Sequence, residues 1–312
     1  MTVLQSIRKH AEENFIVASL ILLILFFSLA TDNFFSTVTL TTILNQLPAL
    51  TVVTVGMTLV LIVSGIDLSV GSVLGFSATV VGVATIGGLP LPLACLVGLG
   101  AGLACGIANG FLVAWLSLPS FIVTLGMLEM ARGLAYLASD SQTVYIGASI
   151  QKIALPLPGI GVSIALVVAI VIVALAQFVL TRTVFGRHLV AIGTNEQAAR
   201  MAGIDSRPYR LAVLALSGLL AGLGGLFNAA YLGSSDPNAG IGLELSAIAA
   251  AVIGGTSLMG GRGSIVGAFA GVLIIAVLQS GLAQLGATEP TKRLITGAVI
   301  VIAVLIDRWR AR

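Results

Sequence analysis

The sequence predicts an all-α integral membrane protein with about ten transmembrane helices. Of its 312 residues, 58% are hydrophobic and only 9% are charged, and the mean hydropathy is +1.12. A chain of this composition has too few polar residues to cover a surface that faces water. Long apolar runs such as IVASLILLILFFSLA at 16–30 lack the alternating polarity of barrel strands. Because a backbone inside lipid must satisfy its own hydrogen bonds, we expect helices, arranged as one transmembrane domain over residues 1–312.

Ten apolar runs are the candidate spans. A helix needs about 20 apolar residues to cross the hydrocarbon core, and the eighth and tenth runs are short by this measure. Nine or eleven spans are therefore the nearest alternatives to ten. In chain order the runs are residues 15–30, 43–64, 71–86, 91–115, 120–138, 162–180, 211–232, 243–258, 264–285 and 294–306.

Basic residues set the orientation, because loops rich in Lys and Arg stay on the cytoplasmic side. If both termini are cytoplasmic, eleven of the 15 basic residues fall inside, five of them in the loop at 182–210. This distribution requires an even number of spans, so it supports ten spans and predicts two cytoplasmic termini. The first run, preceded by Arg8 and Lys9, could instead be a cleavable signal peptide, but we expect an uncut span.

A lone carboxylate, Asp67, stands between the second and third runs, and a similar segment returns between the eighth and ninth runs. In the ten-span topology both copies join helices of the same directions, so the internal repeat is parallel. Ser257 replaces Asp67 in the second copy, and both side chains can accept hydrogen bonds from free amides. We therefore predict two turn or cap residues on the cytoplasmic side, with a transport ligand at Asp67 as the alternative. The matched segments are GSVLG at 71–75 with GSIVG at 263–267, and SGIDL at 64–68 with GGTSL at 254–258.

Glycines four residues apart predict close helix packing, since small residues let membrane helices approach each other. Asn109 lies beside the end of the longer ladder. We expect it to hydrogen-bond a neighbouring helix, although it could also line a translocation path. The ladders are Gly98, Gly102, Gly106 and Gly110 in the fourth run, and Gly263, Gly267 and Gly271 at the ninth run.

The fifth run contains two charged residues, Glu129 and Arg132, three positions apart and hence on one helical face. A lone charge in hydrocarbon costs on the order of 3 kcal/mol or more. The two side chains are therefore expected to neutralise each other inside the bundle. They could line a translocation path or serve as an internal structural pair.

The loop at 182–210 is the longest polar segment on the cytoplasmic side. Thr194 followed by Gln197 fits a capping box, in which Thr194 is the N-cap. Gly203 is placed to end the helix in a left-handed conformation. A short helix at about 194–203 is therefore expected along the inner membrane surface.

Several functions are disfavoured by what the chain lacks. His10 and His188 are its only histidines, so no metal-binding cluster is expected. No G-x-x-x-x-G-K-[ST] loop is present, so ATP would have to be hydrolysed elsewhere. The net charge of +3 follows from the basic residues of the inner segments, and no nucleic-acid partner is expected.

EQAARMAG at 196–203 resembles the Glu-x-Ala-Ala-x-x-x-Gly signature that permeases of ATP-binding-cassette importers present to their ATPase. Three further segments complete the pattern, and together they resemble the ribose-type sugar permease family, within the branched-chain amino acid/ribose permease superfamily, over nearly the whole chain. The segments are VSGIDLSVGS at 63–72, PSFIVTLGMLEMARGLAYL at 119–137 and GLELSAIAAAVIGGTSLMGGRGS at 242–264.

The resemblance implies the permease subunit of an importer in the bacterial inner (plasma) membrane, moving a small sugar of the pentose or hexose class inward. Its partners would be a second permease, identical or not, a cytoplasmic ATPase that binds ATP and Mg²⁺, and an extracytoplasmic sugar-binding protein, with lipid around the spans. The chain itself would be no enzyme and hold no cofactor. Glu129 departs from the family pattern, whereas Arg132 follows it. The signature implies ATPase coupling through Thr194, Asn195, Glu196, Ala198, Ala199 and Gly203.

Two other transport functions remain as alternatives. A secondary transporter driven by protons or sodium would typically show inverted repeats and carboxylates at the membrane midplane, and only Glu129 favours it. A branched-chain amino-acid permease would share the general architecture. The residues do not distinguish one small sugar from another, nor a homodimer from a heterodimer.

Overall fold

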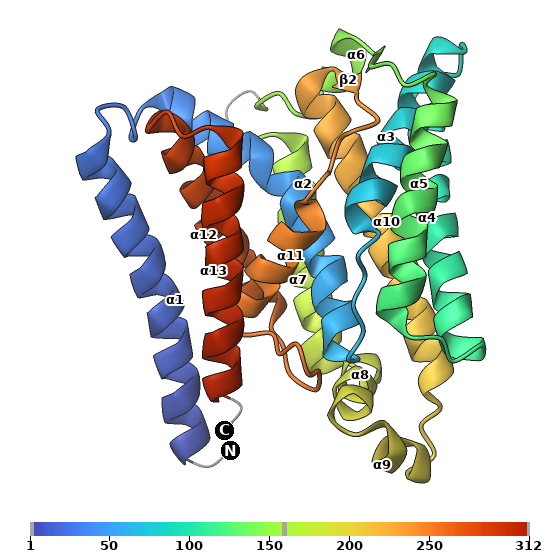
Figure 1. The fold of residues 1–312 in the computed structure, drawn as a ribbon, viewed down its shortest axis with the longest axis vertical. Coiled ribbons are helices and arrows are strands. Elements are labelled where there is room, and N and C mark those ends of the chain that lie inside the picture. Colours follow the sequence, from blue (N-terminus) through green and yellow to red (C-terminus); the bar gives the residue numbers. More distant parts are fainter. Residues whose placement is uncertain (1–2, 158–160, 311–312) are drawn as a thin grey trace.

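The computed structural model describes residues 3–157 and 161–310, and it is a bundle of helices running mostly between the same two ends (Figure 1). The larger helices are α1 (Val3–Ala30), α2 (Thr37–Ile62), α3 (Val70–Ile86), α4 (Leu91–Trp115), α5 (Ser120–Ala138), α7 (Ile164–Arg182), α10 (Ser206–Leu232), α12 (Ile265–Gln284) and α13 (Glu289–Arg310). The shorter elements are α6 (Ala148–Gln151), α8 (Val184–Thr194), α9 (Glu196–Met201), α11 (Leu243–Ile253), β1 (Val144–Tyr145) and β2 (Ser234–Ser235).

Each of the ten predicted apolar runs overlaps a helix, and the predicted bounds of α4 and α5 agree with the observed ones. By length and composition, six helices of the described residues can cross a membrane: α2, α4, α5, α7, α10 and α12. Three further apolar helices are shorter, at Ile16–Ala30, Val70–Ile86 and Leu243–Ile253. A multi-pass helical membrane protein is thus confirmed, whereas the number of spans stays a prediction.

The structure also has elements that the sequence did not predict. α6 and the antiparallel pair β1–β2 lie beyond the apolar runs, and α8 occupies part of the loop that was expected to hold one helix. These elements are short, so they carry little hydrophobic periodicity. Two-residue strands form here because Val144 and Tyr145 find partners in Ser235 and Ser234, which follow α10.

The two ends of the bundle differ. α8 and α9 project from one end, where α1 begins and α13 finishes, while β2 and α6 lie at the opposite end (Figure 1). We call these the α9 end and the opposite end. The start of the first helix and the finish of the last therefore share a side with the polar loop, as the charge distribution requires. Which side is cytoplasmic stays a prediction.

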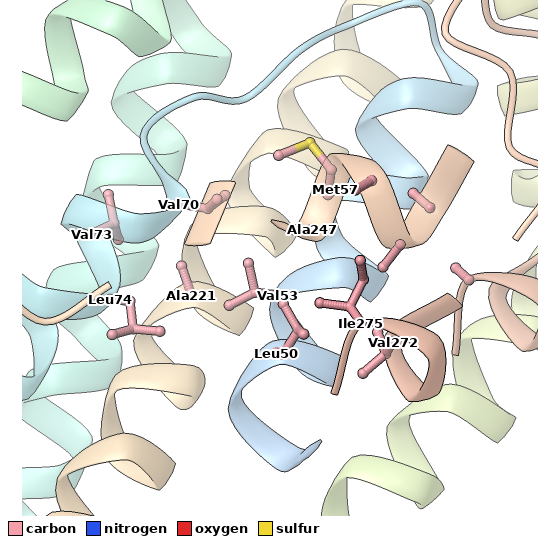
Figure 2. Close-up of a cluster of buried hydrophobic side chains, with 14 of the residues drawn as sticks. Leu50, Val53, Met57, Val70, Val73, Leu74, Ala221, Ala247, Val272 and Ile275 are labelled. Carbon is pink, nitrogen blue, oxygen red and sulfur yellow. The ribbon is translucent and has the colours of Figure 1, made fainter. Parts of the chain in front are cut away.

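α2 is the central helix. It packs against α7, α10, α11 and α12, and 83% of its most apolar stretch is buried, against 28% for α4. The core around it is built from small and medium side chains (Figure 2). Leu50, Val53 and Met57 of α2 share this core with side chains of α3 and α12. A helix surrounded by others needs apolar residues on every face, which explains why the α2 sequence shows no polar stripe.

The connections at the two copies of the repeat differ from the predicted turns at the membrane surface. Residues 63–69 form an irregular segment that climbs from the α9 end of α2 to the start of α3 within the bundle (Figure 1). In the second copy α11 ends early, and residues 254–264 descend from it to the α9 end. Such irregular backbone is tolerated at membrane depth only where protein surrounds it.

Candidate functional site

The short helix α9 forms as predicted, but with a different N-cap. Asn195 caps it, and its Oδ1 accepts the amide of Ala198 at 3.0 Å. Thr194 is the last residue of α8, and its hydroxyl donates to the carbonyl of Val190 instead. The prediction of Thr194 as the N-cap is therefore wrong, because α8 continues through that position and only Asn195 has the extended backbone of a cap.

Gly203 ends this region in the left-handed conformation, with φ of +84°. The amide of Ile204 donates to the carbonyl of Ala199, and that of Gly203 to the carbonyl of Arg200, both at 3.0 Å. This double hydrogen bond is the Schellman motif, which satisfies the last carbonyls of a helix. α9 is thus capped at both ends, although it has only 6 residues.

Glu196 joins α9 to the start of α10. One carboxylate oxygen accepts the hydroxyl of Ser206 at 2.6 Å, and the other accepts Arg210 Nη2 at 2.7 Å. An i,i+4 pair between Glu196 and Arg200 is also present, at the longer distance of 3.8 Å. Two of these partners belong to α10, so Glu196 connects α9 to the start of α10 by direct side-chain contacts.

The outer surface of α9 is open. Ala199 packs inward and is 5% exposed, while Asn195, Gln197 and Ala198 face outward and Met201 is 91% exposed. A small side chain beside a prominent flexible apolar one suits contact with another protein. We call this exposed surface the α9 face; it consists of Asn195, Gln197, Ala198 and Met201.

Three chain segments meet where α2 ends. Ser64, with a left-handed φ of 60°, donates its hydroxyl to the carbonyls of Gly193 in α8 (3.1 Å) and Met259 (3.0 Å). The amide of Gly261 donates to the carbonyl of Ile62 at 2.9 Å. This junction connects α8 with both irregular segments, 63–69 and 254–264. Sequence reasoning missed Ser64, because its partners lie 129 and 195 residues away.

Asp67 is buried, with 1% of its surface exposed, and organises the irregular segment before α3. Its Oδ1 accepts the amide and the hydroxyl of Ser69 at 3.0 and 2.6 Å, and its Oδ2 accepts the hydroxyl of Ser217 in α10 at 2.7 Å. The carboxyl group is therefore a turn former, as expected, that also bonds a distant helix. It does not lie in a surface turn or act as the N-cap of α3, which is Ser69.

Ser257 makes the corresponding local contact. Its hydroxyl accepts the amide of Met259 at 3.2 Å, two residues along, just as Asp67 accepts that of Ser69. The preceding helix ends are offset, however. The left-handed residue is Ser64 in the first copy and Gly255 in the second, one position away from its aligned partner. The local turn is shared, and the structural repeat beyond it stays a prediction.

Asn109 bonds the same irregular segment that Asp67 organises. Its Nδ2 donates to the hydroxyl of Ser69 at 3.0 Å, and the residue is only 1% exposed. On the other side of the irregular segment, Ser120 and Thr124 of α5 accept the amides of Ile66 and Leu68 at 3.0 Å. Asn109 therefore joins α4 to the N-cap of α3, whereas a role for it in a translocation path stays a prediction.

The expected pairing of Glu129 with Arg132 is wrong. Arg132 turns towards the segment after β2, where its Nη1 donates to the carbonyls of Pro237 and Ala239, the latter at 2.9 Å. Glu129 lies on the exposed side of α5 and forms no ion pair with another described residue. Carbonyl groups within reach accept hydrogen bonds from one nitrogen of the guanidinium group, so spacing along one helix did not decide its partner.

The glycine ladders lie where helices touch. A Cβ at Gly102 or Gly106 would come 2.5 or 2.4 Å from a backbone carbonyl oxygen of α10, and one at Gly98 would clash with Val81 of α3. In the second ladder, Gly271 faces the carbonyl of Ala250 in α11. Gly267 faces the carbonyl of Gly254, which is the C-cap of α11. Gly263 instead approaches Ile62 at the junction.

Known proteins match this chain over nearly its whole length. Residues 39–304 match the family described as "Branched-chain amino acid transport system / permease component". The fructose import permease protein FrcC of Rhizobium meliloti is 37% identical, with 99% of this chain and 89% of FrcC aligned. The ribose import permease protein RbsC of Escherichia coli (strain K12) is 38% identical over 93% of this chain and 91% of RbsC. The autoinducer 2 import system permease protein LsrC of Photorhabdus luminescens is 34% identical over 96% and 91%.

The helical fold and these matches define a multi-pass membrane transport protein of the permease class. The chain belongs to the family of permease components of branched-chain amino acid transport systems, which the match over residues 39–304 shows. The resemblance found in the sequence is thereby confirmed.

Proposed function

We propose that this chain is the membrane subunit of an ATP-driven importer that moves a small sugar of the pentose or hexose class inward. The observation that carries the proposal is α9, a closed short helix at the α9 end with an open outer face. Its residues Glu196, Ala198, Ala199 and Gly203 match the signature that importer permeases present to their ATPase. Ten spans and two cytoplasmic termini in a bacterial inner membrane complete the proposed topology.

In this proposal a cytoplasmic ATPase receives the α9 face, with Ala198 allowing close approach and Met201 filling a groove. The ATPase supplies the nucleotide site for ATP and Mg²⁺, since the sequence has no phosphate loop. Closure of the ATPase then displaces α9. The displacement reaches α10 through Glu196 and its partners Ser206 and Arg210.

A second route leads from α8 into the membrane. Ser64 bonds the carbonyl at the C-terminal end of α8 to the segment at 254–264 and stands at the start of the segment at 63–69. A shift of α8 by the ATPase would therefore move both irregular segments together. Because these segments interrupt the spans, they are suited to change conformation between outward-open and inward-open states.

The names of the relatives support the proposed substrate class. FrcC and RbsC are named for fructose and ribose import, so a small sugar is the proposed substrate here. The remaining proposed partners are a second permease, which completes the path across the membrane, and an extracytoplasmic sugar-binding protein that delivers the sugar to the opposite end.

Reconstitution tests this function. The chain is placed in liposomes with a matching ATPase and sugar-binding protein, and labelled ribose and fructose uptake is measured with and without ATP. We expect accumulation only when all components and ATP are present. Uptake by the chain alone that a proton ionophore abolishes would instead support a secondary transporter, and ATP-driven uptake of leucine without sugar uptake would support an amino-acid permease.

A further inference from the structure

Two adjoining cavities occupy the opposite end of the protein, between α2, α10, α11, α12 and α13. One measures about 520 Å³ and the other about 270 Å³. Both are lined by Gln46, Leu243, Ser246 and Gln279, so they meet along a common wall. The larger volume lies within the roughly 300–1,000 Å³ of ordinary small-molecule sites.

Amide side chains dominate the polar lining. Gln46 and Gln279 lie on the shared wall, and Asn45 and Asn228 line the smaller cavity. Within the described part of the chain, none of these four side-chain amides has a hydrogen-bond partner. Gln279 lies five residues before the end of α12, about 8 Å into the helix.

An amide without a partner is costly in an apolar environment, by several kcal/mol. Four of them around one space therefore require water or a polar solute there, and hydrocarbon would not satisfy them. Each amide offers both a carbonyl acceptor and N–H donors, which match the hydroxyl groups of a sugar, each a donor and an acceptor. Hydroxyl and phenol groups add to this lining from Thr42, Ser246 and Tyr231.

Among the described residues that line the two cavities, formal charges occur only in the first turns of α13, at one side of the larger cavity. There Lys292 Nζ lies 2.8 Å from Glu289 Oε1, and Arg293 is adjacent. The shared wall itself is uncharged. A neutral solute therefore suits it better than an ion, whose charge would need an opposite charge beside it.

We infer that this amide-lined cavity binds a neutral polyhydroxylated solute of sugar size within a single permease chain, with Gln46 and Gln279 as its hydrogen-bonding residues. The solute class rests on the proposed function, but the site rests on the lining residues. The cavity then serves as an intermediate binding site for the sugar after it enters from the opposite end. None of Asn109, Glu129 and Arg132, the residues predicted for a path, lines either cavity.

Protection from thiol labelling tests the site. In the full-length chain with Cys95→Ser and Cys105→Ser, Gln279→Cys is treated with a charged methanethiosulfonate reagent, with D-ribose, D-fructose or L-leucine as competitor. We expect position 279 to react, and a sugar at ten times its Kd to slow the reaction about tenfold. Gln142→Cys, exposed in a loop outside the cavity, is the matched control and should react equally fast with and without sugar.

A second variant separates binding from misfolding. Gln46→Leu, added to the labelled protein, should weaken sugar protection about 3- to 10-fold through loss of one side chain's hydrogen bonds. Gln142→Leu should leave it unchanged. Lack of labelling at position 279, labelling that neither sugar slows, or protection by leucine alone would each overturn the inference.

The outcome is independent of the proposed function because labelling needs no ATPase. ATP-driven sugar uptake without sugar protection of position 279 would reject sugar binding in the cavity and leave the proposed function intact. Sugar protection without ATP-driven uptake would reject the proposed function and leave the binding site intact.

Discussion

Glu196 Oε2 lies 2.7 Å from Arg210 Nη2, so a single carboxylate connects the short helix α9 to the start of α10. The two side chains are 35% and 28% exposed, which limits the contribution of the pair to stability to about 1 kcal/mol or less. Its importance is therefore expected in the transmission of movement between the helices rather than in folding.

Removing this charge should uncouple transport. Glu196→Gln keeps an acceptor for Ser206 but loses the charge facing Arg210, so sugar transported per ATP should fall by up to about fivefold, the equivalent of about 1 kcal/mol. The measurement is uptake and phosphate release in the same liposomes. Arg200→Gln is the control, because its pair with Glu196 is longer, at 3.8 Å, and 69% exposed on the arginine side. Equal losses in both variants would show that the link to α10 has no special role.

The packing of α4 on α10 should be intolerant of added volume. Gly106→Ala would place a Cβ 2.4 Å from the carbonyl oxygen of Leu214, and relief of that clash should lower the free energy of unfolding by about 1–3 kcal/mol. Thermal unfolding in detergent measures the loss. Gly100→Ala on the same helix has nothing within 4 Å of the new Cβ and should be neutral or slightly stabilising. A stable Gly106→Ala protein would mean that the two helices are not in close contact.

Arg132 should matter for stability far more than Glu129. Arg132→Met keeps much of the side-chain length but removes the donors to the carbonyls of Pro237 and Ala239, so we expect a loss of roughly 2 kcal/mol. Glu129→Gln breaks no ion pair and should change stability by about 0.5 kcal/mol or less. Chemical unfolding of both variants distinguishes them. If Glu129→Gln destabilised the protein as much as Arg132→Met, the two residues would be paired after all.

Asp67 should be required for the irregular segment before α3. Asp67→Ala removes the acceptor of three hydrogen bonds and should destabilise the protein by roughly 2–3 kcal/mol. Asp67→Asn keeps an acceptor oxygen and should lose less. Thermal unfolding ranks the stability of the unmodified protein and the two variants. Uptake measurements show whether the Asp67→Asn protein transports sugar, which it could not do if Asp67 were a proton carrier. An inactive but fully stable Asp67→Asn protein would return the residue to the role of a transport ligand.

Much of the helical architecture could be predicted from the sequence because lipid restricts the choices. Apolar runs in a membrane must form helices, so the bounds of α4 and α5 follow from where polarity begins and ends. The closure of α9 by Gly203 was also predictable, because the left-handed conformation that ends the helix favours glycine. These are local properties, decided by a residue and its neighbours in the chain.

Other features depended on contacts between distant residues. Nothing beside Arg132 in the sequence indicates that carbonyls over 100 residues away would satisfy it better than Glu129 does. Likewise, Asp67 looks like a surface turn residue until Ser217, 150 residues along, is found against it. A helical membrane permease with a short helix in the polar loop could be predicted from the sequence, because hydrophobicity and local conformation depend on each residue and its chain neighbours. Which polar groups meet depends on the tertiary structure, because a buried donor bonds an acceptor in whichever segment the fold brings beside it.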